Sequence, residues 1–213
     1  DVAPSRGLGD VYKRQKERPA ERKESIMNKK ADVVIVGTGV AGLFSALNLP
    51  DDKEIIMITK SDAESSDSFL AQGGICVLRD EQDYDSYFED TMRAGHYENR
   101  KESVDIMIRS SGKIIEDLVG YGVEFEKDGE AFAYTREGAH SRPRILFHAD
   151  VTGKEITSKL LARVREKNNV TIYEYTTMTD ILEENGKCAG ITVKTKSGEE
   201  SSIYADYTIL ASG

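Results

Sequence analysis

Residues 33–43, Val-Val-Ile-Val-Gly-Thr-Gly-Val-Ala-Gly-Leu, decide the fold that we expect for this chain. An apolar, mostly β-branched run passes directly into Gly37, Gly39 and Gly42, a pattern that predicts a buried strand, a tight turn and a helix. Gly37 permits the turn, Gly39 lets the backbone approach a phosphate, and Gly42 lets the helix lie close to the strand. Because backbone N–H groups at a helix start attract anions, the stretch predicts a pyrophosphate site.

The sequence downstream supports this interpretation. Apolar residues share one helical face, namely Val40, Leu43, Phe44, Leu47 and Leu49. A second apolar strand, residues 55–58, follows at the distance that a βαβ unit needs. The alternative is a glycine turn that serves packing alone. An NAD site calls for an acidic residue after the second strand, but Thr59 and Lys60 stand there, and a lysine cannot accept hydrogen bonds from ribose hydroxyls.

The composition restricts the classes of partner. The chain has 213 residues, 31% of them charged, and a net charge of -9, which argues against nucleic acid and anionic membranes as partners. No apolar run reaches the roughly 20 residues of a membrane span, so we expect a cytoplasmic protein. Cys76 and Cys188 lie far apart and show no metal-type spacing, which fits a reducing compartment better than a disulfide framework.

The two ends of the sequence differ from the middle. Residues 1–26 have no apolar periodicity and precede Met27, so we expect a disordered leader, either foreign to the native protein or translated from upstream, and a domain that spans 27–213. Residues 207–210 predict a strand, and a doubly wound fold would turn toward its ligand after it. We therefore expect a domain that is incomplete at its C-terminus, and a fragment of a longer protein.

Residues 61–75 form a polar loop that closes on Gly73-Gly74. The two glycines would let the backbone pass along a flat ligand, and Gln72 offers a donor and an acceptor to the edge of a heteroaromatic ring. An ordinary Gly-Gly turn explains the same residues. Two helices follow, with buried faces predicted at Tyr84, Tyr87, Phe88, Thr91 and Met92 and at Val104, Met107, Ile108, Ser111, Ile115 and Leu118.

The segment 134–148 gathers two of the three histidines, three arginines and Glu137 in a loop-like setting. Such loops often carry the chemistry of a rigid scaffold. A solvated, charge-balanced loop has the same composition, and the residue types alone do not separate the two readings.

In the last third of the chain, the spacing of apolar residues changes from a helical period to strand-like alternation. Thr152 and Glu155 have the spacing of a helix capping box, and an apolar stripe follows at Ile156, Leu160, Leu161 and Val164. Alternation from residue 171 on, a hairpin turn at Asn185-Gly186 and a further turn at 196–199 predict a β-meander. Residues 207–210 then return to the parallel sheet.

Three segments resemble a known family. Residues 68–75, Ser-Phe-Leu-Ala-Gln-Gly-Gly-Ile, are similar to the flavin-binding segment of the L-aspartate oxidase, succinate dehydrogenase and fumarate reductase flavoproteins. Residues 136–141, Arg-Glu-Gly-Ala-His-Ser, with 144–146 and 150–153, resemble L-aspartate oxidases in particular. The resemblance implies an α/β fold: a Rossmann-like FAD-binding domain with a parallel sheet, flanking helices and a β-meander, whose capping and C-terminal domains would lie beyond residue 213.

The resemblance also implies a function and a set of site residues. L-aspartate oxidases convert L-aspartate to iminoaspartate with FAD as hydride acceptor, reoxidised by oxygen or fumarate, in NAD biosynthesis, where quinolinate synthase is a candidate partner. Glu137 would orient the substrate's amino group, because a carboxylate can pair with an ammonium. The residues expected to bind FAD are Gly37, Thr38, Gly39, Val40, Ala41, Gly42, Lys60, Asp67, Ser68, Phe69, Leu70, Ala71, Gln72, Gly73 and Gly74.

One departure from the wider family bears on the cofactor. Asp67 stands where succinate dehydrogenases and fumarate reductases carry the histidine that bonds covalently to the flavin, so we expect FAD to be held non-covalently. Alternatives are a soluble flavoprotein of the fumarate reductase or succinate dehydrogenase type, which Glu137 and Asp67 disfavour, and a non-catalytic nucleotide-binding module. With the capping domain missing, residues 27–213 should be inactive alone, and we expect no metal, nucleic-acid or membrane partner.

Overall fold

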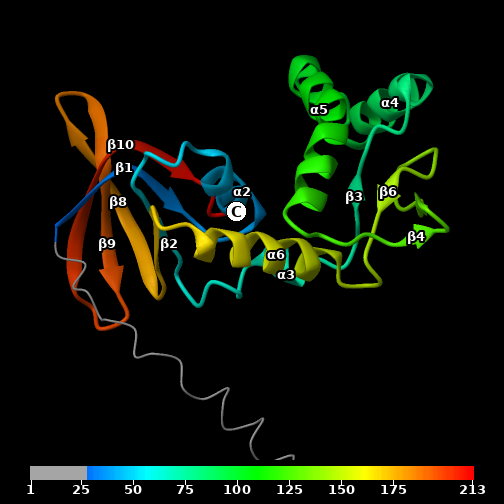
Figure 1. Cartoon of the computed structure of the whole chain (residues 1–213). Coiled ribbons are helices and arrows are strands. Elements are labelled where there is room, and N and C mark those ends of the chain that lie inside the picture. The colour runs from blue at the N-terminus through cyan, green and yellow to red at the C-terminus, as the bar shows by residue number, and fades with distance from the viewer. Residues whose placement is uncertain (1–27) are drawn as a thin grey trace, which may run out of the picture.

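The computed structural model describes residues 28–213, so the expected leader at 1–26 lies outside the described residues. The elements in chain order are β1 (Lys29–Val36), α2 (Val40–Asn48), β2 (Ile55–Ile58), α3 (Asp67–Leu70), β3 (Ile75–Cys76), a 3-10 turn (Glu81–Asp83), α4 (Tyr84–Ala94), α5 (Lys101–Gly120), β4 (Lys127–Asp128), β5 (Ala131–Phe132), β6 (Ile145–Leu146), α6 (Thr152–Glu166), β7 (Val170–Tyr173), β8 (Thr176–Glu184), β9 (Lys187–Thr195) and β10 (Glu200–Leu210). Figure 1 shows the main sheet at one end and a lobe of α4, α5, β3, β4 and β6 at the other, with α6 running between them.

The main sheet has six strands in the order β7-β2-β1-β10-β9-β8. The strands β7, β2, β1 and β10 run parallel, whereas β10, β9 and β8 form an antiparallel meander. This mixed sheet with flanking helices confirms the predicted α/β fold with its β-meander. The hairpin turn at Asn185-Gly186 is confirmed too, with φ of 54° and 76° at its two residues, as a type I′ turn requires.

Two details of the strand prediction were wrong. Residues 170–173 do not belong to the meander, because α6 returns the chain to the free edge of β2, where β7 pairs in parallel. The meander's last strand and the returning strand are one element, since β10 pairs antiparallel with β9 through residues 200–204 and parallel with β1 from Ile203 to Leu210. The sheet is therefore continuous from the nucleotide side to the meander.

The main core lies between the sheet and the helices α2 and α6. The apolar stripe of α6 is buried as predicted, and Leu43 of α2 packs with it against Val33 and Ile35 of β1. Val40, predicted on the same stripe, is 39% exposed at the first position of α2. The described residues contain no helix long and apolar enough to span a membrane.

The predicted capping box of α6 was wrong. Residue Thr152 is already inside the helix, and its Oγ1 accepts the N–H of His148 at 3.0 Å instead of a helix N–H. The Glu155 carboxylate accepts the N–H of Glu124 at 3.0 Å, so it fastens a neighbouring loop to the helix. The spacing was correct, but Thr152 caps the preceding loop four residues earlier, and Glu155 holds a segment 31 residues away.

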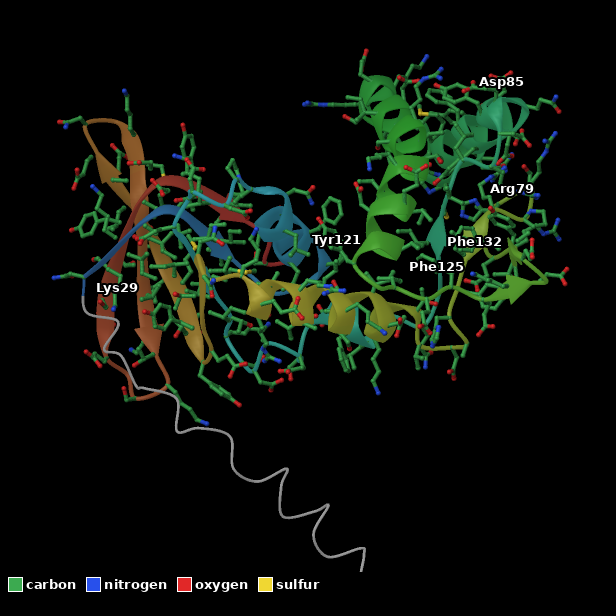
Figure 2. The ribbon with its side chains drawn as sticks, in the orientation of Figure 1. Lys29, Arg79, Asp85, Tyr121, Phe125 and Phe132 are labelled. Carbon is green, nitrogen blue, oxygen red and sulfur yellow. The ribbon has the colours of Figure 1, made fainter. Side chains whose placement is uncertain are left out.

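The second lobe is built on the pair α4 and α5. Tyr87, Met92, Val104 and Ile108 form its core, whereas Met107, predicted on the same face, is 46% exposed. Aromatic contacts join the lobe to the main domain: Phe44 of α2 meets Tyr121 edge-on at 6.4 Å between ring centroids. Figure 2 shows Tyr121 at the end of α5 nearest α2, with Phe125 and Phe132 close by in the lobe.

Candidate functional site

The glycine turn after β1 is wedged between two neighbouring strands. Gly37 has a φ of +113°, and a Cβ there would lie 2.2 Å from the carbonyl oxygen of Ala211, just after β10. Its N–H donates to the carbonyl of Ile58, the last residue of β2, at 2.8 Å. Only glycine fits both this backbone conformation and this space.

The same turn begins α2. Gly39 is the N-cap residue, and the first intrahelical bond runs from the N–H of Leu43 to its carbonyl at 3.0 Å. The Val40 N–H, one turn earlier, donates to Ser68 Oγ at 3.2 Å. A Cβ on Gly42 would lie 2.1 Å from the carbonyl oxygen of Gly37, so the helix start presses directly on the turn. The first turn carries no acidic side chain, which leaves the helix dipole free to attract an anion.

A cavity of about 480 Å³ opens above this turn, at the carboxyl ends of β1, β2 and β10. Its wall consists of residues 36–41, 58–61, 65–68, 176–178 and 210–213. Among these residues of the described chain, Lys60 is the one cation and Asp67 the one carboxylate, and hydroxyl side chains supply most of the other polar groups. The structure thus brings together the predicted residues Gly37, Thr38, Gly39, Val40, Ala41, Lys60, Asp67 and Ser68.

The remaining predicted contacts lie outside this cavity. Gly42 packs on Gly37, as described, and residues 69–74 lead away from the cavity toward β6. Residues 70–74 are exposed, and Gly74 packs so tightly that a Cβ would lie 2.2 Å from Ile145 Cγ2. For Gly74, close packing on β6 is therefore the structural reason for glycine, and no ligand is needed to explain it.

Glu137 lies beside the far end of this exposed strip. A Cβ on Gly73 would sit 3.5 Å from Glu137 Oε2. The Glu137 side chain is exposed, and among the described residues it has no hydrogen bond or ion pair, although Arg136 and Arg142 are close in sequence. Its backbone carbonyl accepts the N–H of His140 at 3.2 Å, which closes the segment into a turn.

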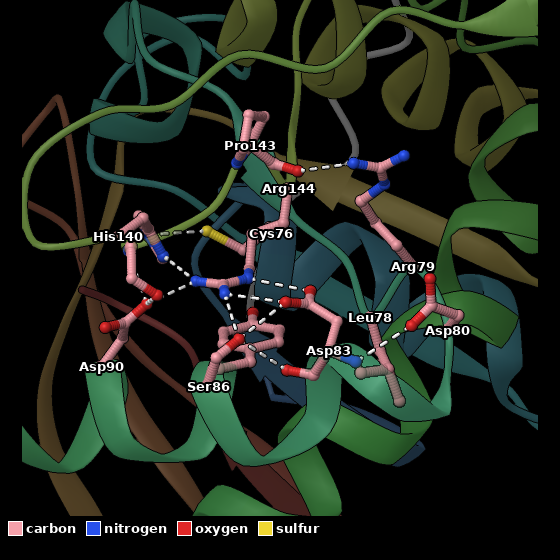
Figure 3. A network of polar contacts seen from close by, with 12 residues as sticks. Cys76, Leu78, Arg79, Asp80, Asp83, Ser86, Asp90, His140, Pro143 and Arg144 are labelled. Carbon is pink, nitrogen blue, oxygen red and sulfur yellow. Dashed lines mark hydrogen bonds and ion pairs between the residues drawn. The ribbon is translucent and has the colours of Figure 1, made fainter.

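A buried ionic cluster lies next to this turn, and Figure 3 shows it. Arg144 is fully buried and pairs with two carboxylates of α4, one at its N-cap and one two turns further on: its Nη2 lies 2.9 Å from Asp83 Oδ1 and its Nη1 2.7 Å from Asp90 Oδ2. Ser141 donates to Asp90 Oδ2 through both its N–H, at 2.6 Å, and its hydroxyl, at 2.7 Å. The cluster therefore joins α4, β6 and the turn that carries Glu137.

The cluster sets the protonation of its members. Burial alone would raise the pKa of Asp90, but hydrogen bonds from Ser141 and Arg144 outweigh burial and hold that pKa below its usual range. For Asp83, likewise, hydrogen bonds from Arg144 and Ser86 overcome burial and lower the pKa. Burial and the neighbouring Arg144 charge both lower the pKa of His140, which favours a neutral imidazole at neutral pH.

The comparison with known families decides the class of this site. The sequence model described as "FAD binding domain" matches residues 32–213. The chain belongs to the FAD-binding domain family.

Curated relatives of this FAD-binding domain are similar over nearly the whole chain. It is 44% identical over 187 residues to an L-aspartate oxidase of Clostridium perfringens, which covers 88% of this chain and 42% of the relative. It is 41% identical over 188 residues to an L-aspartate oxidase of Clostridium acetobutylicum, which covers 88% of this chain and 43% of that relative. The chain thus spans less than half the length of these relatives.

Solved structures share the fold. An E. coli quinol fumarate reductase superimposes with a TM-score of 0.83 at 23% identity, over 88% of this chain and 33% of that one. The Sdh1 complex of Mycobacterium smegmatis gives a TM-score of 0.79 at 24% identity, over 88% of this chain and 34% of that one. At this level of identity the likeness establishes the fold alone.

The residues of the cavity fit FAD. The start of α2 offers N–H groups and a positive dipole end to a pyrophosphate, Gly39 lets the Ser68 hydroxyl approach this turn, and Lys60 adds a cation. The acidic residue typical of NAD sites after β2 is replaced by Thr59 and Lys60, and the family match indicates FAD as the nucleotide. Within residues 28–213 no three His, Cys, Asp or Glu side chains are arranged to hold a metal ion.

Sequence reasoning missed Asp83 and Asp90. The face predicted for α4 comprised Tyr84, Tyr87, Phe88, Thr91 and Met92, and neither acid was considered. A signal was present, because Asp83, Tyr87 and Asp90 follow one another at helical spacing and therefore share a face. The charged residues of segment 134–148 differ in their surroundings. Arg144 is buried in an ionic cluster, whereas Glu137 is exposed and unpaired among the described residues.

Proposed function

We propose that this FAD-binding domain is part of an L-aspartate oxidase, which oxidises L-aspartate to iminoaspartate in NAD biosynthesis. Two observations support the proposal: relatives named L-aspartate oxidase are 41–44% identical over 88% of the chain, and Glu137 is an unpaired carboxylate beside the exposed strip. Because the chain covers 42–43% of those relatives, the proposal concerns the whole gene product that contains it.

The cavity residues hold the nucleotide in this proposal. The first-turn N–H groups of α2 and the Ser68 hydroxyl, which already contacts that turn, face the pyrophosphate. Lys60, exposed at the end of β2, neutralises part of its charge from the nucleotide half. When bound, FAD supplies the hydride acceptor for the reaction.

The strip from Phe69 to Gly74 carries the flavin in the same proposal. It begins at the cavity wall and ends at Glu137, so a ligand bound in the cavity can extend along it toward the substrate. Gln72 is exposed there and can present its amide to the ring edge. Asp67 lacks the nucleophilic nitrogen of a histidine, so the flavin is held without a covalent bond.

The observation that carries the proposal is that the Glu137 carboxylate is exposed and has no hydrogen-bond or ion-pair partner among the described residues. An exposed carboxylate without a protein partner, beside the end of the flavin strip, can form a charge-assisted hydrogen bond with a substrate ammonium. Succinate and fumarate have no such group. The site therefore favours an amino acid over a plain dicarboxylate.

The proposal also includes the electron acceptor, the cellular compartment and the enzyme that consumes the product. Oxygen or fumarate reoxidises the flavin, the enzyme works in the cytoplasm, and quinolinate synthase takes up the iminoaspartate. The reactive imine favours a short path between producing and consuming enzymes, because water hydrolyses it.

The test is anaerobic reduction of the flavin in the gene product that contains this chain. Addition of L-aspartate should bleach the yellow absorbance, and succinate at the same concentration should not. Bleaching by succinate alone would assign a succinate dehydrogenase-type flavoprotein instead. Bound flavin that neither substrate reduces would assign a nucleotide-binding module.

A further inference from the structure

Arg144 uses every donor of its guanidinium inside the protein. An arginine has five N–H groups in a planar fork. Its Nε and Nη2 donate to the two oxygens of Asp83 at 3.0 and 2.9 Å, and the second Nη2 proton reaches Ser86 Oγ at 2.9 Å. Its Nη1 donates to Asp90 Oδ2 at 2.7 Å and to His140 Nδ1 at 3.1 Å. A fully buried cation with five matched acceptors is a fixed anchor that a lysine, with three donors on a flexible stem, cannot reproduce.

This anchor fixes the proton on His140. Since the guanidinium can only donate, His140 Nδ1 must accept, and a neutral imidazole then carries its proton on Nε2. That Nε2 lies 3.2 Å from Cys76 Sγ, which takes the role of acceptor. The ring is also packed edge-on against Tyr87, at 6.1 Å between centroids. His140 therefore has one tautomer and one orientation.

The anchor also fixes the turn that carries Glu137. Outside the turn itself, residues 137–141 make polar contacts with this cluster: Ser141 contacts Asp90, and His140 contacts Arg144 and Cys76. The Ala139 carbonyl accepts from Arg93, which itself pairs with Asp90, at 3.3 Å. The Glu137 side chain is exposed and forms no hydrogen bond or ion pair among the described residues. Its place beside Gly73 thus depends on the turn, and the turn depends on the cluster.

We propose that Arg144 is a positioning residue, which holds the turn of residues 137–141 so that the Glu137 carboxylate stays where an amino-acid substrate places its ammonium group. This inference rests on the function proposed above. Arg144 is fully buried and does not line the cavity above the glycine turn, so it would act through Asp90, Ser141 and His140. The neutral imidazole matters for the same reason, because a protonated His140 would offer Glu137 a competing cation.

The first test is spectroscopic and needs no activity. Long-range proton–nitrogen correlation spectra should show His140, identified by its loss in His140→Gln, as a neutral Nε2–H imidazole at pH 7. Arg144→Lys should replace this pattern with the mixed tautomers of an ordinary histidine, whereas Arg109→Lys, a matched change at an exposed arginine that pairs with Asp105, should leave it intact. An Nδ1–H tautomer in the unchanged protein would overturn the proposal.

The second test is kinetic, in the gene product that contains this chain. Arg144→Lys should lower kcat/KM for L-aspartate about tenfold to a hundredfold through a misplaced Glu137, with FAD affinity and fumarate reduction changed far less. If Arg144→Lys fails to fold, Ser141→Ala, which removes one hydroxyl contact with Asp90, should still lower kcat/KM for L-aspartate about twofold to tenfold. Equal losses with L-aspartate and fumarate, or no loss in Ser141→Ala, would overturn the proposal. An unchanged protein that does not oxidise L-aspartate would instead refute the proposed function and leave the spectroscopic result standing.

Discussion

Gly42→Ala tests whether the glycine turn positions α2 for the cofactor. The new Cβ would lie 2.1 Å from the Gly37 carbonyl oxygen and 3.4 Å from Ile35 Cγ2. Because carbon atoms pack at about 3.5–4 Å, the helix start must move away from β1 by roughly 1 Å. Overpacking of this kind costs about 1–3 kcal/mol, whereas alanine in place of glycine in a helix returns about 1 kcal/mol. The net loss in the free energy of unfolding should therefore be about 0–2 kcal/mol.

The effect on FAD should exceed the effect on folding. Hydrogen bonds to the pyrophosphate need donor–acceptor distances of about 2.7–3.2 Å, so a shift of roughly 1 Å breaks those from the first turn of α2. One lost bond to a charged group costs about 1.5–3 kcal/mol, which predicts FAD binding weaker by at least about tenfold.

Titration of the apoprotein with FAD, followed by flavin fluorescence, measures this affinity, and urea unfolding measures stability. The matched control is Gly112→Ala in α5, where a Cβ meets nothing within 4 Å. It should stabilise the protein by about 1 kcal/mol and leave the FAD affinity unchanged. Equal FAD affinity in Gly42→Ala and the unchanged protein would refute the reasoning.

Three further predictions concern acid stability, the attachment of the flavin and the charge of Lys60. The Asp83 and Asp90 carboxyls have folded-state pKa values below their ordinary value of 3.8, so their stabilisation is complete above that pH and is lost as the pH falls through the lowered values; urea midpoints should be steady down to about pH 4 and then drop. With Asp67 in place of a histidine, the yellow chromophore should pass a filter after mild acid or heat, and colour that stays with the polypeptide would contradict this. Lys60→Ala should weaken FAD binding about twofold to fivefold, an effect that shrinks in high salt because the side chain is exposed; no salt dependence would contradict a charge contact.

Local patterns predicted the elements around the cavity well. The strand, turn and helix at 33–43 follow from neighbouring residues, since apolar alternation and glycine spacing act within a few positions. The same holds for the α6 stripe and for the hairpin at Asn185-Gly186, whose positive φ angles suit those two residue types.

Contacts between distant residues were beyond the same reasoning. Arg144 meets Asp83 and Asp90 across 61 and 54 positions of sequence, and nothing within any one segment indicates that the three charges pair. Gly74 was assigned to a turn or a flat ligand, yet its space is set by β6, seventy positions along the chain. Glu155 had the right spacing for a cap, yet its carboxylate accepts the N–H of Glu124, 31 positions earlier in the chain.

The most direct test of the central claim is Glu137→Gln in the gene product that contains this chain, with L-aspartate oxidation and fumarate reduction measured side by side. Loss of one charge-assisted interaction, worth about 1.5–3 kcal/mol, should lower kcat/KM for L-aspartate by about one to two decades. Fumarate reduction should change much less, because fumarate has no ammonium group. Glu130→Gln, at an exposed glutamate of the same lobe, should change neither. Equal losses with both substrates in Glu137→Gln would contradict the account and make Glu137 a structural residue of its loop.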